Sequence, residues 1–451
     1  MTDITFTGKR AEGKVSPPPS KSHTHRAIIM AALSGGKCRI TNPLVSLDTQ
    51  ATMDAVRTMG AVVTEEPGAV VVDGTVNHIP DREIDVKNSG TTLRIMTAVS
   101  ATYDQVVDLT GDYYLKKRPM GPLLKALHDS GVKVASSEEG TAPVKVQGPI
   151  TGELMEIKGN VSSQFITGLL MAAPLAQHDI DVKVRGQIVS RPYIDITLSM
   201  MKRFGVEVET EVEQLQQGPL SLNRAAYGPD KSEITHFKVK KQNYVPADYA
   251  VPADFSSAAF PLVAGALGGK VTVTGMDLED AQGDKKIIDI LKKVGCTIEV
   301  NGDEVTCYRT GDLQATEINM GSIPDLFPIV CILLATAKGT SRLYGAPQLK
   351  FKESDRIAIM VKMLKDLGAK VKATDDGCLI KGVERLHGAR IDHSNDHRMM
   401  MAGAVASLVA DGPISMENDG CWEVSYPGFV EQMQSLGFEV GSREVDPDDD
   451  F

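Results

Sequence analysis

An amphipathic helical pattern ends in a glycine and passes into alternating apolar and polar residues six times along the chain. AVRTMGAVV at 55–63 and LKKVGCTIE at 291–299 are two of these endings. A glycine just past a helix takes the left-handed cap conformation at little cost, and the alternation after it is typical of a β-strand. The glycines recur at intervals of 69 to 90 residues, at Gly60, Gly131, Gly205, Gly295, Gly368 and Gly437. This spacing predicts one supersecondary unit present in six copies.

A second pattern accompanies each copy: an almost wholly apolar helical segment runs into a strand that stops at glycine or asparagine. These segments are 26–42, 94–111, 164–186, 255–275, 323–345 and 397–418. A helix that is apolar on every side must be buried. Each copy is therefore predicted to contain a buried helix, an amphipathic outer helix and several strands, which is a layered α/β design with helices inside.

The longest interval between the repeated glycines contains the polar, proline-containing stretch 227–254, where we place the crossover between two domains of three copies each. The short segment before the prolines at 17–19 precedes the first copy and is expected to pair with the second half. The predicted domains are 1–16 with 250–451, and 17–249. Two connecting strands would form a hinge near 14–20 and 245–252.

Composition narrows the class of protein. A hydrophobic content of 42% suffices for two cores, and a net charge of −11 argues against a nucleic-acid surface. The six cysteines form no CxxC pair and are expected to be reduced core residues in a cytosolic protein. The start shows neither a signal nor a transit pattern, and the longest apolar stretch is too short to span a bilayer. We expect a cytoplasmic monomer with a disordered acidic tail at 446–451.

Polar residues stand at or near the front of every predicted buried helix. They are Arg26, Arg94, Gln164, Ser256 with Ser257, Asp325, and His397 with Arg398. Capping explains any one of them, but arginine is a poor N-cap because it adds positive charge to the positive end of the helix. Three such arginines in a negatively charged chain indicate anion sites, where helix dipoles and guanidinium groups act together.

Further candidate chemistry lies between these helices. KFKESDRI at 350–357 sets Lys352 and Arg356 four residues apart, on one helix face, with Glu353 beside them; a solvated ion pair is the ordinary alternative. Arg118 stands at the entrance of a helix predicted to start at Pro119. Asp325 is either a helix cap or, in a basic pocket, a general base.

His393 and His397 form an HxxxH pair near Asp396, which superficially suggests a metal site. We expect no metal there, because no third ligand follows at a suggestive spacing and the neighbouring Arg398 disfavours a cation.

Eight motifs occur in one order across the chain: PSKSHTHR, NSGTTLR, LTG with RPM, SSQ, SRPYID, PD, KESDR and DHR. Together they resemble the 5-enolpyruvylshikimate-3-phosphate (EPSP) synthase family of the shikimate pathway, which leads to the aromatic amino acids. The resemblance implies two domains, each of three repeated βαβαββ units, in the inside-out α/β barrel of the enolpyruvyl transferase fold. It also implies closure over shikimate 3-phosphate and phosphoenolpyruvate, without a cofactor.

The resemblance assigns roles residue by residue. The residues implied to bind shikimate 3-phosphate are Lys21, Ser22, Arg26, Ser162, Ser163, Gln164, Ser190, Tyr193, Asp325, Gln348 and Lys352. Those implied to bind phosphoenolpyruvate are Lys21, Gly90, Arg118, Gln164, Arg356 and Arg398. Asp325 and Glu353 would manage protons, assisted by Lys21. Several fixed cations suit two substrates that carry phosphates and a carboxylate.

Three positions depart from the family pattern. Val424 stands where a lysine is often found before the late aromatic–proline motif, Gln348 replaces a frequent asparagine, and Ile95 replaces a proline. They bear on affinity more than on reaction type.

Three alternatives stay open. The first is the sister enzyme that acts on UDP-N-acetylglucosamine, which usually carries a reactive cysteine in a mobile loop. The second is a non-catalytic anion-binding protein, for which Asp325 and Glu353 would have no use. The third is a metallohydrolase built on His393 and His397.

Overall fold

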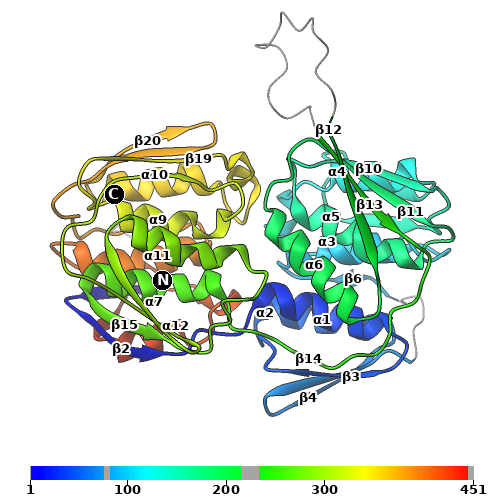
Figure 1. Cartoon of the computed structure of the whole chain (residues 1–451), viewed down its shortest axis with the longest axis horizontal. Coiled ribbons are helices and arrows are strands. Elements are labelled where there is room, and N and C mark those ends of the chain that lie inside the picture. The colour runs from blue at the N-terminus through cyan, green and yellow to red at the C-terminus, as the bar shows by residue number, and fades with distance from the viewer. Residues whose placement is uncertain (1, 76–81, 215–232, 445–451) are drawn as a thin grey trace, which may run out of the picture. The chain divides into compact units, whose positions relative to one another are not determined.

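Six helices are buried along nearly their whole length and coincide with the six apolar segments of the sequence (Figure 1). The computed structural model describes residues 2–75, 82–214 and 233–444. Within these residues the inner helices are α1 (Lys21–Leu33), α3 (Gly90–Ser100), α5 (Ser163–Ala172), α7 (Phe255–Gly268), α9 (Phe327–Leu334) and α11 (His397–Ala406). Short 3-10 turns, η2 (Ala173–Leu175) and η7 (Ser407–Val409), prolong α5 and α11. The prediction of buried helices is confirmed.

The outer helices alternate with the inner ones along the chain. They are α2 (Leu47–Thr58), α4 (Gly121–Asp129), α6 (Arg191–Arg203), α8 (Ile287–Lys293), α10 (Arg356–Asp366) and α12 (Phe429–Ser435). Each is followed by one of the six repeated glycines, and all six have φ between 80° and 105°. A strand begins one to three residues later in every case. The glycines are therefore left-handed helix terminators, as the sequence predicts.

Five four-stranded sheets share one order: a parallel pair, followed by two antiparallel partners. Three sheets lie within residues 37–250: β14 (Tyr249–Ala250), β3 (Lys37–Thr41), β5 (Ala69–Asp73), β4 (Val62–Glu66); β6 (Ile84–Asp85), β7 (Val107–Thr110), β9 (Val144–Gln147), β8 (Lys133–Ala135); and β10 (Leu154–Lys158), β11 (Ile180–Arg185), β13 (Glu233–Val239), β12 (Val208–Gln214). The other two are β2 (Ala11–Val15), β15 (Gly269–Val273), β17 (Glu304–Arg309), β16 (Cys296–Asn301); and β18 (Glu317–Asn319), β19 (Thr340–Tyr344), β21 (Gly377–Lys381), β20 (Lys370–Thr374).

The N-terminal strands complete sheets made by the second half of the chain. β1 (Thr2–Gly8) lies between β22 (Ile414–Glu417) and β23 (Phe438–Glu444), antiparallel to both. A parallel bridge from Arg390 to Ser415 stands where the other sheets have their fourth strand. β2 pairs in parallel with β15. The expectation that the segment before the prolines pairs with the second half is confirmed.

The chain divides into two compact units. The central unit is Lys21–Val251, and the terminal unit combines Met1–Ser20 with Pro252–Phe451. The domain limits at 17 and 249 and the hinge near 14–20 and 245–252 stay predictions. The acidic tail at 446–451 and residues 227–232 of the crossover stretch lie outside the described residues.

Close packing of the inner helices leaves little room for side chains between them. In the central unit a Cβ at Gly168 of α5 would lie 2.9 Å from the carbonyl oxygen of Arg94 on α3, so only glycine lets the two backbones approach this closely. All six cysteines are buried and free, as expected of reduced core residues. Within the described ranges no helix is both long enough and apolar enough to cross a membrane.

Replacing Gly295 with alanine should lower the free energy of unfolding by about 1–2 kcal/mol, because an L-residue pays this cost in the left-handed region. Its φ is 103°, yet an added Cβ would meet its nearest neighbour, the Asp312 carbonyl oxygen, only at 3.6 Å, so the cost is backbone strain without a clash. Urea unfolding measures it. Gly311→Ala is the control, since its Cβ would meet nothing within 4 Å and its φ is unstrained. Equal stabilities of the two variants would contradict the capping role.

Candidate active site

Lys21 begins α1 and forms an ion pair with Asp48, with 2.8 Å between Nζ and Oδ2. Asp48 lies in the first turn of α2, which starts with a capping box formed by Ser46 and Thr49. Burial alone would raise the pKa of Asp48, but the Lys21 ammonium and the His25 ring hold that pKa well below its usual range. Asp48 is therefore a charged carboxylate that fixes the position of the Lys21 ammonium.

A chain of buried hydroxyl groups links the same helix to the NSGTTLR loop. His25 Nδ1 contacts Thr52 Oγ1, Thr52 Oγ1 contacts Thr92 Oγ1, and Thr92 Oγ1 contacts Ser89 Oγ, each at 2.6 Å. Ser89 is the N-cap of α3, directly before Gly90. Burial lowers the pKa of His25, which favours the neutral ring. The network fixes the start of α3 relative to α1 and α2.

Arg26 is a buried cation whose acceptors are all neutral oxygens. Its side chain donates to Thr197 Oγ1 at 2.8 Å, the Ser22 carbonyl at 2.8 Å, and Thr167 Oγ1 and the Tyr193 carbonyl at 3.2 Å. These contacts occupy four of the five N–H donors of the guanidinium. Burial lowers its pKa to about 10, so it stays protonated at neutral pH. Arg26 holds α1, α5 and α6 together and keeps an uncompensated positive charge.

Arg94 and Gln164 form a second polar contact between inner helices. Arg94 Nη1 donates to Gln164 Oε1, and its guanidinium carbon lies 5.0 Å from the centre of the Phe165 ring. Gln164 Nε2 in turn donates to Thr91 Oγ1 at 3.0 Å. The Gln164 amide is thereby held at the front of α5, close to the first turn of α3.

Gly90, the first residue of α3, lies against the side chain of Arg118. A Cβ added at Gly90 would be 2.5 Å from Arg118 Nη1 and 2.7 Å from Cζ. Arg118 follows the short turn η1 (Leu115–Lys117) and is buried. It does not stand at a helix entrance, as predicted, because α4 starts at Gly121 and Pro119 instead bridges to Thr141.

The neutral residues of the central unit lie at helix starts. Ser162 is the N-cap of α5 and accepts from the Gln164 backbone N–H at 3.3 Å, with Ser163 as the first helical residue. Ser190 precedes α6 in the left-handed conformation, with φ 55°, and Tyr193 lies in the first turn. Such backbone strain in a non-glycine residue is most frequent at functional sites.

In the terminal unit one arginine gathers three carboxylates. Arg356 donates from Nε and Nη2 to both oxygens of Asp396, at 2.9 and 3.2 Å, from Nη1 to Asp325 at 2.8 Å, and from Nη2 to Glu353 at 2.8 Å. The Arg356 side chain is 1% exposed and Asp396 is fully buried. Burial opposes the charge of Arg356, but the three carboxylates raise its pKa above the ordinary value. The cluster is a compensated ion network and not a bare basic pocket.

Asp325 is the carboxylate shared by the cations of this cluster. Besides Arg356, it faces Lys352 Nζ at 3.2 Å and Arg398 Nη2 at 3.9 Å. It lies in the turn η5 (Pro324–Leu326), directly before α9, and makes no capping bond there. The alternative of a simple N-cap is therefore wrong, and the carboxylate is surrounded by positive charge.

Two sequence predictions about local structure are wrong. Arg26 and Arg94 lie in the second turns of α1 and α3, because Lys21 and Gly90 begin these helices. Lys352 and Arg356 do not share a helix face, because α10 starts only at Arg356 with Asp355 as its N-cap. Lys352 follows the turn η6 (Pro347–Phe351) in an extended conformation, and its contact with Arg356 runs through Asp325.

Asp284 is a buried carboxylate near the same cluster. It lies in the turn η4 (Gly283–Lys286) and accepts from Ser256 Oγ at 2.5 Å. Burial, and next the negative charge of Asp325, raise its pKa to about 7. A group with this pKa exchanges its proton near neutral pH.

The remaining expected residues of this unit lie in turns. Gln348, in η6, is buried and donates from Nε2 to the Gly321 carbonyl at 3.0 Å. Val424 ends the turn η8 (Cys421–Val424), so no ammonium group occupies this position.

Comparison with known proteins identifies the family. The sequence model described as EPSP synthase (3-phosphoshikimate 1-carboxyvinyltransferase) matches residues 6–433. The chain belongs to the EPSP synthase family. A 3-phosphoshikimate 1-carboxyvinyltransferase of Methanocorpusculum labreanum is 42% identical over 97% of this chain and 99% of the relative. One from Methanosphaera stadtmanae is 37% identical over 95% and 98%. The solved EPSP synthase of Acinetobacter baumannii is 26% identical, with a TM-score of 0.76 over 98% of this chain and all of that one.

Three carboxylates that contact or neighbour the EPSP synthase motifs were missed by sequence reasoning as functional candidates: Asp48, Asp284 and Asp396. Asp48 and Asp396 occupy positions that look like ordinary helix starts, and Asp396 was noticed only for its histidine neighbours. Their partners are 27 and 40 residues away in the chain for the first and last pair. Helix spacing does not reveal such contacts.

Asp284→Asn should stabilise the protein at pH 8 relative to pH 5. The folded carboxyl has a pKa of about 7, and an unfolded one titrates near 3.9. Between these values the folded state binds the extra proton, so the free energy of unfolding falls as pH rises and stays low above pH 7. Asparagine cannot ionise, so the difference between variant and wild type should grow from pH 5 to pH 8 in urea unfolding.

Asp289→Asn is the matched control, because it removes one carboxylate from the exposed face of α8. An effect of Asp284→Asn that is the same at both pH values would show that this carboxyl does not titrate between them.

Proposed function

We propose that this chain transfers the enolpyruvyl (carboxyvinyl) group of phosphoenolpyruvate to the 5-hydroxyl of shikimate 3-phosphate, releasing phosphate. The observation that carries this proposal is membership of the EPSP synthase family along nearly the whole chain. The clustering of Asp325, Glu353, Lys352, Arg356 and Arg398 in one unit supports the chemistry.

The reaction needs a proton acceptor, a proton donor and fixed positive charge. The 5-hydroxyl loses a proton and attacks C2 of phosphoenolpyruvate while C3 gains one, and the tetrahedral intermediate then loses phosphate and a C3 proton. We assign proton transfer to Asp325 and Glu353, which are partly exposed, unlike the buried Asp396. Both contact the same guanidinium, which stabilises their charged forms and positions them.

The central unit supplies groups suited to the anionic substrates. Lys21 is held by Asp48, and Arg26 keeps a positive charge with neutral partners only among the described residues. The shikimate 3-phosphate roles of Ser22, Ser162, Ser163, Ser190, Tyr193, Gln164, Gln348 and Lys352 stay predictions. So do the phosphoenolpyruvate roles of Gly90, Arg118, Arg356 and Arg398, the cytoplasmic location and the monomeric state.

The alternatives are less well supported. A protein that only binds anions gains nothing from three carboxylates around Arg356, since they compete with the ligand for the cation. The relatives named above act, by name, on 3-phosphoshikimate and not on a nucleotide sugar. His397 is not part of the one group of potential metal ligands among the described residues, which speaks against a hydrolase built on the HxxxH pair.

Mixing the protein with shikimate 3-phosphate and phosphoenolpyruvate should release inorganic phosphate, measured by a coupled colorimetric assay. Asp325→Asn should lower kcat by about 100-fold or more, which is typical when a general base is lost, while calorimetry still detects shikimate 3-phosphate binding. Turnover of UDP-N-acetylglucosamine in place of shikimate 3-phosphate would refute the proposal. Full activity of Asp325→Asn would refute only the assignment of the base.

Gly90→Ala should raise the KM for phosphoenolpyruvate about tenfold or more. The new Cβ would lie 2.5 Å from Arg118 Nη1, so the flexible guanidinium has to move, and a hydrogen bond to a charged group is worth about 1.5–3 kcal/mol. Gly121→Ala is the control: it lies three residues from Arg118 and its Cβ would meet nothing within 4 Å. An unchanged KM in Gly90→Ala would remove Arg118 from the phosphoenolpyruvate site.

A further inference from the structure

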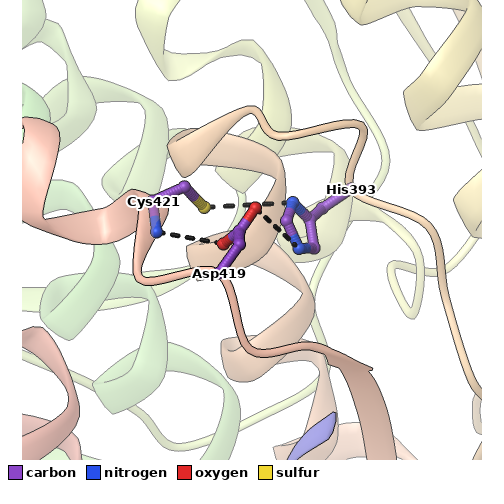
Figure 2. A group of neighbouring side chains, drawn as sticks. All are labelled: His393, Asp419 and Cys421. Atoms are coloured by element: carbon purple, nitrogen blue, oxygen red, sulfur yellow. Dashed lines mark hydrogen bonds and ion pairs between the residues drawn. The ribbon is translucent and has the colours of Figure 1, made fainter. Parts of the chain in front are cut away.

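We propose that His393, Asp419 and Cys421 form a binding site for a divalent transition metal ion of the zinc type. One ligand atom of each residue lies within 4.8 Å of those of the other two (Figure 2). Imidazole nitrogen, thiolate sulfur and carboxylate oxygen are the three donors that zinc sites use. The group lies in the terminal unit, where the residues precede α11 and begin η8.

The histidine is already oriented as a ligand. His393 Nε2 lies 3.1 Å from the carbonyl oxygen of Glu417, which can only accept, so Nε2 carries the proton. Nδ1 then keeps its lone pair, and it faces Cys421 Sγ at 3.9 Å. A ring N–H donated to a backbone carbonyl is the usual support for a metal-bound histidine.

The spacing is close to that of a tetrahedral ion. Bond lengths of about 2.1 Å to nitrogen and about 2.3 Å to sulfur place these two ligand atoms about 3.6 Å apart. Nδ1 and Sγ are 3.9 Å apart, so a shift of a few tenths of an ångström suffices. Asp419 Oδ1 accepts from the Cys421 backbone N–H at 3.0 Å, which ties the carboxylate to the cysteine. Its side chain is 20% exposed and gives an ion a route from solvent.

The charges of the site call for a cation. The Cys421 thiol is buried, and burial together with the Asp419 carboxylate raises its pKa above the ordinary value. A bound divalent ion would displace the thiol proton, forming a metal–sulfur bond and releasing H⁺ to solvent. The carboxylate that disfavours a bare thiolate would then be an additional ligand.

The sequence motif pointed to a different grouping. The HxxxH pair predicts His393 with His397, but His397 begins α11 and is not a member of this group. The partners of His393 come 26 and 28 residues later in the chain, from a segment without any zinc-finger spacing. The expectation that the chain holds no metal rested on the missing third ligand, which the fold supplies.

The site also adjoins the ion network of Arg356. The Asp396 backbone N–H donates to the His393 carbonyl at 3.0 Å, and Asp396 is the buried partner of Arg356. Cys421 and Val424 are the two ends of one turn. An ion at this site would fix both segments and place a positive charge in the same turn as Val424, where a lysine is frequent in the family.

Titration of the full-length protein, freed of metal by chelation, with Zn²⁺ alone tests the proposal. One equivalent should bind, with release of a proton visible as a dependence of the calorimetric heat on the ionisation enthalpy of the buffer. Co²⁺ in place of Zn²⁺ should give a sulfur-to-metal charge-transfer band. Cys421→Ser and Asp419→Asn should each weaken Zn²⁺ binding at least about tenfold, and Cys421→Ser should abolish the band.

Cys296→Ser is the matched control, because it removes a buried thiol of the same unit that contacts another thiol, Cys307. It should keep the equivalent and the band. Failure to bind one equivalent, or binding that survives in Cys421→Ser and is lost in Cys296→Ser, would overturn the proposal. Asp419→Asn, with its partly exposed side chain, decides the case if Cys421→Ser does not fold. None of these readouts depends on transferase activity.

Discussion

Burial of the inner helices is the constraint on which the rest of this structure depends. Because these helices are enclosed, the polar groups at their N-terminal ends need partners within the protein or in a ligand. Ser89, Ser162, Asp254 and Asp396 satisfy backbone N–H groups as N-caps of α3, α5, α7 and α11. A repeated buried helix thus brings a polar end into the interior with each copy, and the copies differ in what they place there.

The two units meet this constraint in different ways. In the central unit Arg26 is satisfied by hydroxyl and carbonyl oxygens, so its positive charge is not cancelled by its contacts. In the terminal unit Arg356 is satisfied by three carboxylates. The first arrangement favours a bound anion, and the second holds carboxylates ready for proton transfer. Both follow from the cost of burying an unpartnered charge.

The repeat architecture could be predicted from the sequence because it is encoded locally. A left-handed glycine, an apolar run and an alternating strand are each visible within about 20 residues, and all six glycines, including Gly60 and Gly437, end helices as expected. The site could be predicted only as far as single motifs carry it. Lys352 reaches Asp325 from an extended segment, and Arg26 lies a turn deeper than its motif suggests, because helix starts are the least certain part of such a prediction.

Contacts between distant segments escaped the sequence for a physical reason. The pairs Lys21–Asp48, Arg356–Asp396 and Ser256–Asp284 form because different helices are packed against each other, not because of any spacing along one helix. An aspartate at a helix start has an adequate local explanation as a cap, so its second role in an ion pair leaves no mark in the sequence. Only the fold shows that Asp396 caps α11 and binds Arg356 at once.

The compensated state of Arg356 couples anion binding to proton transfer. Its contacts occupy four of the five N–H donors, all with carboxylates. An anionic substrate that takes one of these donors must displace Asp325 or Glu353, since Asp396 is held from both oxygens and is fully buried. A carboxylate that loses a neighbouring cation gains proton affinity, because its charged form is less stabilised. Arrival of the anion would therefore convert a structural ion pair into a group able to accept a proton, at the moment when the hydroxyl nucleophile has to lose one.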